Sequence, residues 1–290
     1  MHLVSVITPS YNQGNYIEKT ILSVLDQTYQ NIEFIIIDGG STDNTLNIIK
    51  KYESEIDYFV SEPDKGQADA INKGIKQAKG KFICWVNSDD ILYPDFIRER
   101  VQQFTDFPDA DMIYGDVEQG TDLKKKILRR GRQTNFLDML CSGDVPIPQQ
   151  SAVFSADILK KVGFLNPYWN VLLDRDLFMK IGYYGNIQYY PGVAGFFLNH
   201  ENSKSIAQEM EWVREFPIYY HWLFDEFLNK SYLKYKRTAY SNIYGRCAVI
   251  SFKNSRFELY IKYIFLSIIR NPLMGIRYML KSFLIKSTNG

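Results

Sequence analysis

Short apolar runs alternate with amphipathic stretches through the first half of the chain, and this alternation constrains the fold more than any other feature. Buried strands are indicated at Leu3–Thr8, Ile32–Asp38 and Phe82–Asn87. Three stretches between and after them place apolar residues on one side of a helix, namely Tyr16–Leu25, Thr45–Tyr52 and Ala68–Ala78. Strands and helices that alternate in this way build a mostly parallel sheet covered by helices. The sequence therefore predicts an α/β fold.

A polar, turn-forming cluster follows each of the three predicted strands. The clusters are Pro9-Ser10-Tyr11-Asn12, Gly39-Gly40-Ser41-Thr42-Asp43 and Ser88-Asp89-Asp90. In a parallel sheet the carboxyl ends of the strands lie along one edge, and ligands bind there. We therefore expect the three clusters to meet at one site.

Weaker patterns extend the prediction to the rest of the chain. Asp111–Gly120 and Ser151–Phe154 indicate strands, and Lys124–Arg132 indicates a loop or hairpin. Helices are expected at Ala156–Val162, which Gly163 should end, and at Val171–Gly182. From about residue 208 the pattern is wholly helical.

Composition and standard motifs limit the functional class. Three scattered cysteines and the lack of an export signal at Met1 predict a reducing, cytoplasmic location. The chain has neither a phosphate-binding P-loop nor a dinucleotide-binding glycine motif, so ATPases and dinucleotide enzymes lack their fingerprints. Asp89 and Asp90 offer hard oxygen ligands of the kind that Mg²⁺ or Mn²⁺ prefers, although acids at this place can also cap a helix.

Several motifs together resemble those of glycosyltransferase family 2. The chain carries TPSYN at Thr8–Asn12, EFIIIDGGSTD at Glu33–Asp43, DKGQADAINKG at Asp64–Gly74 and WVNSDD at Trp85–Asp90. The similarity in order and spacing is continuous over residues 1–120 and patchy to residue 205. The resemblance implies the GT-A fold of the nucleotide-diphospho-sugar transferases, in the inverting, bacterial cell-surface polysaccharide type.

The resemblance also implies which residues bind the donor. It places Pro9 and Tyr11 beside the nucleotide base and gives Asp38 a hydrogen bond to the base. A carboxylate acceptor suits the imide N–H of uracil or thymine, so a UDP- or dTDP-sugar is favoured. Asp69 and Asn72 lie near the start of a helix, where N–H groups favour anions, or are ordinary first-turn residues. The expected donor-binding residues are Thr8, Pro9, Tyr11, Asp38, Gly39, Ser41, Gly66, Asp69, Asn72, Asn87 and Ser88.

The metal ligand implied by the resemblance is Asp89, with Mn²⁺ or Mg²⁺ as the cofactor. The family's motif is commonly Asp-x-Asp, and this chain has Asn87 at its first position. Asp90 is a second candidate ligand. His200 is a third, because the stretch HENSKS at His200–Ser205 resembles a later family segment near the diphosphate, where an imidazole can stabilise leaving-group charge.

A second acidic motif resembles the one that carries the family's catalytic base. It lies at Asp174-Arg175-Asp176-Leu177, within a predicted helix. Positions i and i+2 of a helix point to different sides, so only one acid can face the acceptor. The resemblance favours Asp174 as general base, with Asp176 as runner-up and a solvated acidic helix face as the alternative.

The last 60 residues form a basic helical tail. Residues 231–290 contain 11 Lys or Arg and one acid, Glu258, whereas the whole chain has a net charge of +1. Helices are expected at Phe257–Asn271 and Pro272–Lys286, and charges interrupt both too often for a membrane span. We expect attachment to the anionic inner face of the cell membrane, with packing on the main domain or a homodimer through the tail as alternatives. No nucleic-acid-binding motif is present.

These observations predict a catalytic domain at residues 1–207 and a helical region at 208–290. Residues 1–120 should bind the nucleotide sugar and metal, and residues 121–207 should face the acceptor. The expected reaction is metal-dependent, inverting, non-processive transfer of a sugar to a glycan or polyprenyl-linked saccharide hydroxyl. Two rivals remain, a sugar-nucleotide nucleotidyltransferase and a catalytically silent glycan-binding or scaffold protein.

Overall fold

The computed structural model describes residues 1–200 and 208–288, which form two compact units. The sheet unit contains residues 1–134, 146–168 and 173–200. The helical unit contains residues 135–145, residues 169–172 and the described residues from 208 onward. Two short segments from the predicted catalytic domain therefore belong to the helical unit.

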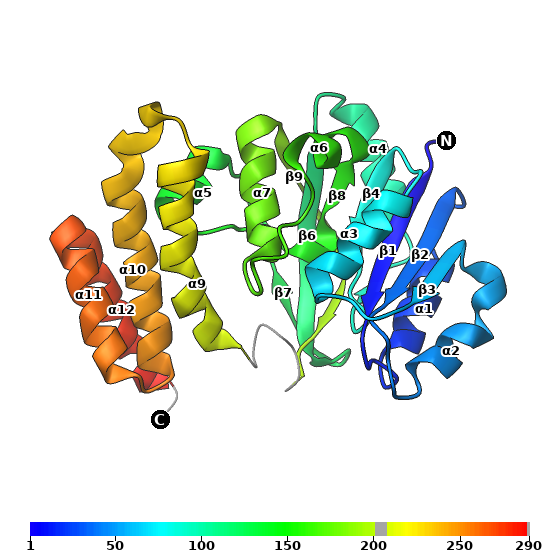
Figure 1. The fold of residues 1–290 in the computed structure, drawn as a ribbon, viewed down its shortest axis with the longest axis horizontal. Helices are drawn as coiled ribbons and strands as arrows, with labels where there is room; N and C mark the ends of the chain where they lie inside the picture. Colours follow the sequence, from blue (N-terminus) through cyan, green and yellow to red (C-terminus); the bar gives the residue numbers. More distant parts are fainter. Residues whose placement is uncertain (201–207, 289–290) are drawn as a thin grey trace. The chain divides into compact units, whose positions relative to one another are not determined.

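A single nine-stranded sheet forms the centre of the sheet unit (Figure 1). Its order is β3-β2-β1-β4-β8-β6-β9-β5, with β7 paired to β6. The first four strands in this order are parallel, as predicted, and β8 runs antiparallel to both of its neighbours. The strands are β1 (Val4–Ser10), β2 (Ile32–Asp38), β3 (Tyr58–Ser61), β4 (Phe82–Trp85), β5 (Ile91–Leu92), β6 (Met112–Asp122), β7 (Lys125–Arg129), β8 (Val153–Ser155) and β9 (Ile187–Leu198).

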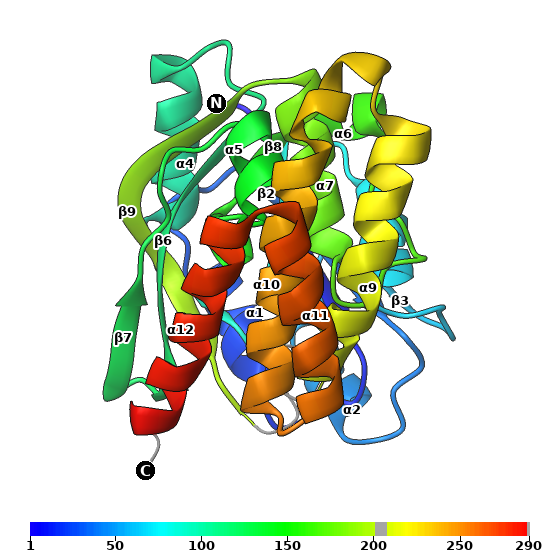
Figure 2. The same ribbon diagram turned by 90° about the vertical axis from the view of Figure 1, so that its left-hand side faces the viewer.

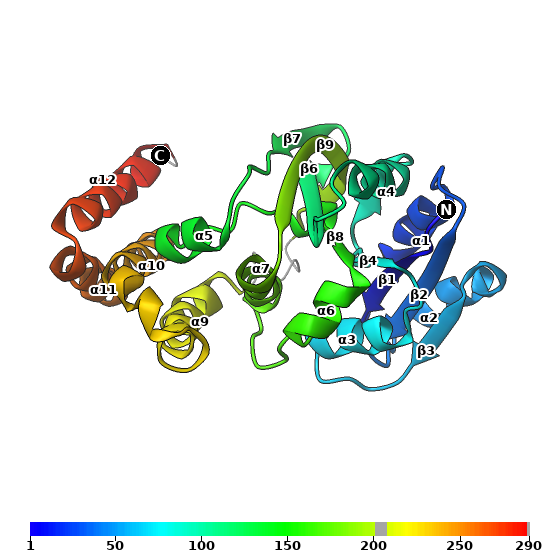
Figure 3. The same cartoon turned by 90° about the horizontal axis from the view of Figure 1, so that it is seen from above.

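Helices cover both faces of the parallel half of this sheet (Figure 3). Strand β1 is buried along its whole length, because α1 packs in one core cluster with Val4 and Val6 on one face. On the other face a Cβ atom at Gly74 of α3 would lie 2.5 Å from Ile7, so only glycine fits this contact. The helices of this unit are α1 (Ile17–Leu25), α2 (Thr45–Lys51), α3 (Gln67–Gln77), α4 (Phe96–Asp106), α6 (Ala156–Val162) and α7 (Leu173–Tyr184).

The end of α6 and the β6–β7 hairpin lie where the sequence predicted a helix end and a loop or hairpin. Gly163 ends α6 with φ 84°, a left-handed conformation in which glycine is unstrained, and the Ser155 side chain caps the start of the same helix. The basic stretch predicted as a loop or hairpin forms the hairpin of β6 and β7. Helix α7 begins at Leu173, two residues later than predicted.

The helical unit consists of α5 (Phe136–Ser142), α9 (Glu209–Trp222), α10 (Lys236–Lys253), α11 (Phe257–Arg270) and α12 (Pro272–Thr288). The last three helices lie side by side (Figure 2). The hydroxyls of Ser241 in α10 and Ser267 in α11 donate to each other's backbone carbonyls, at 3.0 and 2.8 Å. A Cβ atom at Gly245 would lie 2.1 Å from Tyr278, so α12 approaches α10 closely. Small residues therefore set the spacing of this bundle.

A buried carboxylate holds the short segment that enters α7. Glu215 of α9 accepts hydrogen bonds from the backbone N–H groups of Asn170, Val171 and Leu172, at 2.8, 3.1 and 3.2 Å. These residues belong to the helical unit, although they precede α7 directly in the chain. Across the described part of the chain, no helix has the length and apolar character needed to cross a membrane.

Candidate active site

Hydrogen bonds tie together the loops that follow β1 and β2. The N–H of Gly39 donates to the carbonyl of Ser10 at 2.8 Å. The N–H of Asn12 donates to the Ser41 hydroxyl at 2.7 Å, and the Asn12 side chain accepts from the N–H of Thr42 at 2.9 Å. Asn12 has φ 52°, a left-handed conformation that asparagine tolerates better than most residues. These bonds give the predicted ligand-binding edge a defined shape.

Asp38 is the centre of the loop after β2. Its side chain is fully buried. The carboxylate accepts the N–H groups of Gly40 and Ser41 at 3.0 and 2.8 Å, and the hydroxyls of Ser41 and Ser61. Asp38 therefore organises its own loop and exposes no surface to a ligand in this structure.

The residues predicted beside the nucleotide base differ in exposure. Thr8 and Pro9 lie within β1 and are buried, whereas Tyr11, just past the strand, is 59% exposed. An exposed aromatic ring at a strand end offers a flat surface on which a base can stack. Among these three residues, Tyr11 has the side chain that a base can reach.

Gly66 and Asp69 lie at the start of α3, and Asn72 lies further along the same helix. Gly66 caps the helix with φ 104°, and Asp69 lies in the first turn, where it accepts the N–H of Lys65 at 3.1 Å. The Asn72 amide both donates to and accepts from the backbone of Leu165, at 2.8 and 3.0 Å. These bonds give Asn72 a structural role, and its contact with the donor stays a prediction.

Asn87 holds the acidic loop in place through its side-chain amide. Its oxygen accepts from the side chain of Gln67 at 2.9 Å. Its nitrogen donates to Asp90 at 2.9 Å and to Gln149 at 3.3 Å. Ser88 beside it is buried. The amide at this position therefore links β4, α3 and the loop that carries the predicted metal ligand.

Asp89 and His200 meet at the end of the described stretch of the sheet unit. The Oδ2 atom of Asp89 lies 2.9 Å from Nε2 of His200, and the two side chains are 17% and 13% exposed. The imidazole stacks on the ring of Tyr16, with centroids 4.6 Å apart and planes inclined by 25°. Two candidate ligands far apart in sequence are thus brought together, while residues 201–205 of the same predicted motif lie outside the described residues.

Asp90 is a weaker candidate ligand than Asp89. Its side chain is 1% exposed, and burial followed by the negative charge of Asp89 holds the pKa of Asp90 well above its ordinary value. A carboxyl group in such surroundings favours its neutral form, and Asn87 already donates to one of its oxygens. Asp89, which is 17% exposed, therefore has the more accessible carboxylate of the two, and its role as metal ligand stays a prediction.

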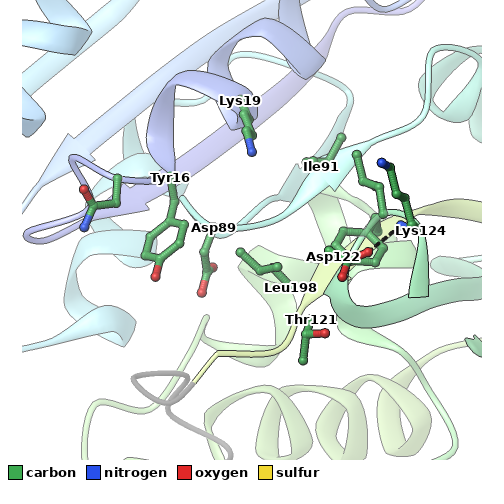
Figure 4. Close-up of a pocket in the computed structure, with 11 residues that line it drawn as sticks. Tyr16, Lys19, Asp89, Ile91, Thr121, Asp122, Lys124 and Leu198 are labelled. Atoms are coloured by element: carbon green, nitrogen blue, oxygen red, sulfur yellow. Dashed lines mark hydrogen bonds between the residues drawn. The ribbon is translucent and has the colours of Figure 1, made fainter. Parts of the chain in front are cut away.

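A cavity of about 570 Å³ opens beside Asp89 (Figure 4). Its lining combines apolar side chains from β5, β9 and the β6–β7 turn with cations from α1 and the same turn. The lining residues are Asn15, Tyr16, Lys19, Asp89, Ile91, Thr121, Asp122, Leu123, Lys124, Phe196 and Leu198. Sequence reasoning did not identify Tyr16, Lys19 or Lys124, because only the fold brings α1 and the hairpin turn to this place.

The two acids of α7 have different surroundings. Asp176 is fully buried and pairs with Lys180 at 2.7 Å. Asp174 keeps some solvent exposure and accepts the N–H of Arg175 at 2.7 Å. Burial of its carboxyl group raises the pKa of Asp174 above the ordinary value of 3.8. Of the two, Asp174 is the one whose carboxylate is not committed to a lysine partner.

The residues present fit a divalent cation that takes two protein ligands. Among the residues that the structure describes, no group of three or more His, Cys, Asp or Glu side chains could hold a metal. The Asp89 carboxylate and the His200 imidazole lie 2.9 Å apart, and a carboxylate oxygen with an imidazole nitrogen is a pair of donors that suits Mn²⁺. Phosphate oxygens of a nucleotide commonly complete the coordination of a cation bound by few protein groups.

The fold is that of the GT-A type glycosyltransferases, as two solved structures show. Residues 1–349 of S. aureus TarS in complex with UDP-GlcNAc match with a TM-score of 0.65 and 15% identity, over 96% of this chain and 92% of that chain. The mannosyltransferase PcManGT from Pyrobaculum calidifontis, in complex with GDP-Man and Mn²⁺, matches with a TM-score of 0.58 and 16% identity, over 97% of this chain and 87% of that chain. At these identities the likeness concerns the fold alone, and it confirms the predicted fold.

The sequence itself places the chain in one family. Residues 5–163 match the model of Glycosyl transferase family 2, so the chain belongs to that family and the predicted family is confirmed. An uncharacterized glycosyltransferase of Rickettsia felis is 35% identical over 189 residues, which cover 62% of this chain and 31% of the relative. The putative teichuronic acid biosynthesis glycosyltransferase TuaG of Bacillus subtilis is 42% identical over 103 residues, which cover 34% of this chain and 41% of that relative. The matched parts span less than half the length of both relatives.

Proposed function

We propose that this protein is an inverting, non-processive, metal-dependent glycosyltransferase that uses a nucleotide diphosphate sugar, with a UDP- or dTDP-sugar favoured. The observation that carries the proposal is the pairing of Asp89 with His200 at 2.9 Å beside the polar ends of β1 and β2, in a chain of family 2. The UDP-GlcNAc bound to the structurally similar TarS supports a uridine donor.

Asp89 and His200 are the residues that would hold Mn²⁺ or Mg²⁺. Bound there, the cation would neutralise charge on the departing nucleoside diphosphate. Lys19 and Lys124, which line the same cavity, add positive charge near the diphosphate. The exposed ring of Tyr11 would stack on the base.

Asp174 is the proposed general base. Its carboxylate accepts the proton of the acceptor hydroxyl while the oxygen of that hydroxyl forms a bond to the anomeric carbon of the sugar. The bond between that carbon and the phosphate oxygen breaks, and its electron pair leaves with the nucleoside diphosphate. Attack opposite to the leaving group inverts the anomeric configuration. The raised pKa of Asp174 makes its carboxylate a stronger proton acceptor than an ordinary aspartate.

The proposed acceptor is a glycan or polyprenyl-linked saccharide in the synthesis of a surface polysaccharide. The name of the B. subtilis relative, a putative teichuronic acid biosynthesis enzyme, supports this class. A sugar-nucleotide nucleotidyltransferase is less well supported, because residues Pro9–Gln13, at the end of the first strand and in the turn after it, include no cation to bind a triphosphate. A catalytically silent protein would need none of Asp89, His200 and Asp174.

A panel of nucleotide sugars separates these alternatives. In the presence of Mn²⁺ we expect one UDP- or dTDP-sugar to raise the melting temperature, since a ligand at 100 times its Kd stabilises the folded state by about 2.7 kcal/mol. We also expect the protein to hydrolyse that sugar nucleotide slowly. Stabilisation without any donor turnover would favour the silent protein. Formation of a sugar nucleotide from a nucleoside triphosphate and a sugar phosphate would favour the nucleotidyltransferase.

We also propose that the protein is peripheral on the inner face of the cell membrane, attached through α11 and α12. Each helix carries a row of exposed large apolar side chains, between 44% and 82% exposed, at spacings of three or four residues. The rows are Phe257, Ile261, Phe265 and Ile269 in α11, and Leu273, Ile276, Leu280 and Leu284 in α12. Exposed Lys262, Arg277 and Lys281 each directly follow a residue of these rows. Apolar rows flanked by cations fit an anionic bilayer surface.

Charge reversal in this region is expected to release the protein from vesicles. The double variant Lys262→Glu, Arg277→Glu should bind anionic vesicles at least about tenfold less tightly, because each cation near the surface contributes about 1 kcal/mol. Flotation with phosphatidylserine vesicles measures the binding, and Lys50→Glu, Lys76→Glu in the sheet unit is the matched control. Equal flotation with neutral and anionic vesicles would contradict the proposal. A loss of self-association in sedimentation, without any change in flotation, would show that the rows form a homodimer instead.

A further inference from the structure

The hairpin of β6 and β7 carries a dense group of exposed cations. Residues 121–130, here called the basic hairpin, are all exposed, and among the described strands β7 pairs with β6 alone. The basic hairpin contains five Lys or Arg and a single acid, Asp122. The Asp122 carboxylate accepts the backbone N–H groups of Lys124 and Lys125 at 2.7 and 2.9 Å. These bonds fix the turn, so the cations stand on a defined surface.

An ion pair accounts for one of these five cations. Nζ of Lys126 lies 2.5 Å from the Glu118 carboxylate of the neighbouring strand. In the part of the chain that the structure describes, no ion pair joins the charged groups of the other four, which are Lys124, Lys125, Arg129 and Arg130. Four positive charges close together are therefore available to an anionic partner.

Large aliphatic side chains are exposed between the cations. Leu123 in the turn is 50% exposed, and Ile127 and Leu128 of β7 are 65% and 43% exposed. Successive side chains of a strand point to opposite faces, so each face of β7 places one aliphatic side chain next to cations. Charges alone would protect an edge strand from pairing with another chain. The exposed aliphatic groups indicate a partner that offers both anions and an apolar layer.

We propose that the basic hairpin docks the sheet unit on an anionic phospholipid bilayer, separately from α11 and α12. The four cations would reach headgroup phosphates, and Leu123, Ile127 and Leu128 would lie among the first carbons of the acyl chains. A soluble polyanion, such as an anionic glycan, has charges for the cations but no apolar layer for these three side chains.

The turn of the basic hairpin also borders the cavity beside Asp89. Leu123 and Lys124 line this cavity together with Leu198 of β9 (Figure 4). The proposed bilayer contact and the cavity therefore share the turn as a wall. A bilayer at the hairpin would bring a lipid-linked acceptor next to the cavity, and this part of the inference rests on the proposed function.

Vesicle flotation of the whole chain tests the docking surface. Lys125→Glu, Arg130→Glu should bind phosphatidylserine vesicles at least about tenfold more weakly than wild type, because both cations would face headgroup phosphates. Neither residue lines the cavity. Lys50→Glu, Lys76→Glu makes the same change of net charge at other exposed residues of the sheet unit, and this control should bind like wild type.

A second variant separates a bilayer from a soluble polyanion. Ile127→Thr, Leu128→Thr keeps every charge and should weaken vesicle binding about tenfold, because less apolar surface is buried in the bilayer. Its retention on heparin, a soluble polyanion, should stay that of the wild type. Both side chains are exposed and threonine suits a strand, so the melting temperature should change little.

Wild-type flotation of a folded Lys125→Glu, Arg130→Glu variant would overturn the role of the hairpin, and would leave attachment through α11 and α12 and the proposed transfer reaction standing. An equal loss in Lys50→Glu, Lys76→Glu would overturn it as well, since net charge alone would then explain binding. Unchanged flotation of Ile127→Thr, Leu128→Thr, with heparin retention lost in the charge variant, would identify a soluble polyanion as the partner. A wild type that binds no vesicles would contradict the membrane location without bearing on the donor.

Discussion

Asp174→Asn is expected to lower kcat by about 10² to 10⁴-fold while nucleotide affinity stays close to that of the wild type. The asparagine side chain has nearly the same shape but cannot accept the acceptor's proton. Sugar transfer or donor hydrolysis measures kcat, and calorimetry with UDP and Mn²⁺ measures nucleotide affinity. Near-full turnover in Asp174→Asn together with a loss in Asp176→Asn would move the base to Asp176.

The raised pKa of Asp174 also predicts how its replacement affects stability. Burial raises the pKa of Asp174 in the folded state above 3.8, its ordinary value in the unfolded chain. The ionised carboxylate therefore lowers the free energy of unfolding at neutral pH, and this loss disappears below pH 3.8, where the group is protonated in both states. Asp174→Asn should therefore raise the melting temperature at pH 7, and this gain should shrink as the pH falls through the folded-state pKa. The same titration should make kcat of the wild type fall on acidification at a pH above 3.8.

Asp176→Asn is the matched control for this prediction. Asp176 is fully buried and lies 2.7 Å from Nζ of Lys180, whose side chain is 11% exposed, so its replacement removes one charged partner from a nearly buried ammonium group. Breaking a buried pair in this way costs about 3–5 kcal/mol. Asp176→Asn should thus lower the melting temperature, and opposite shifts in the two variants would separate the proposed base from its structural neighbour.

Asp89→Ala is expected to remove the metal dependence of donor binding. The variant should bind UDP at least about 100-fold more weakly in Mn²⁺, since even residues that only support metal ligands contribute 10–100-fold to metal affinity. His200→Ala should give a smaller loss of the same kind. Calorimetry of UDP with Mn²⁺ and with EDTA measures the difference, and Asp109→Ala, at an exposed acid of the same unit, is the control. Unchanged affinity in Asp89→Ala would assign the cation to another residue.

Sequence patterns predicted the parts of the fold that depend on local order. Strand β2 matches its predicted bounds at Ile32–Asp38, because the apolar run Phe34–Ile37 followed by Asp38 and two glycines leaves few alternatives to a buried strand. Gly163 ends α6 for a reason visible in the sequence alone, since glycine adopts the left-handed conformation without strain. The hairpin of β6 and β7 was predicted only as an alternative to a loop, because its strand residues Lys125–Arg129 are all exposed.

Long-range contacts account for what the sequence did not predict. The motif containing Asp38 indicates an acceptor at the end of β2, but burial of that carboxylate depends on Ser61 of β3. The assignment of residues 169–172 to the helical unit depends on Glu215, whose buried carboxylate has no signature in its own helix. None of these contacts follows from periodicity or from motif spacing.

The anomeric configuration of the first product tests the central claim most directly. An α-linked UDP- or dTDP-sugar that stabilises the protein should be incubated with Mn²⁺ and followed by proton NMR before mutarotation equilibrates the released sugar. An inverting enzyme that uses Asp174 as general base should release the β-anomer first, and Asp174→Asn should slow that release by about 10²-fold or more. Initial release of the α-anomer, or an unchanged rate in Asp174→Asn, would contradict the account.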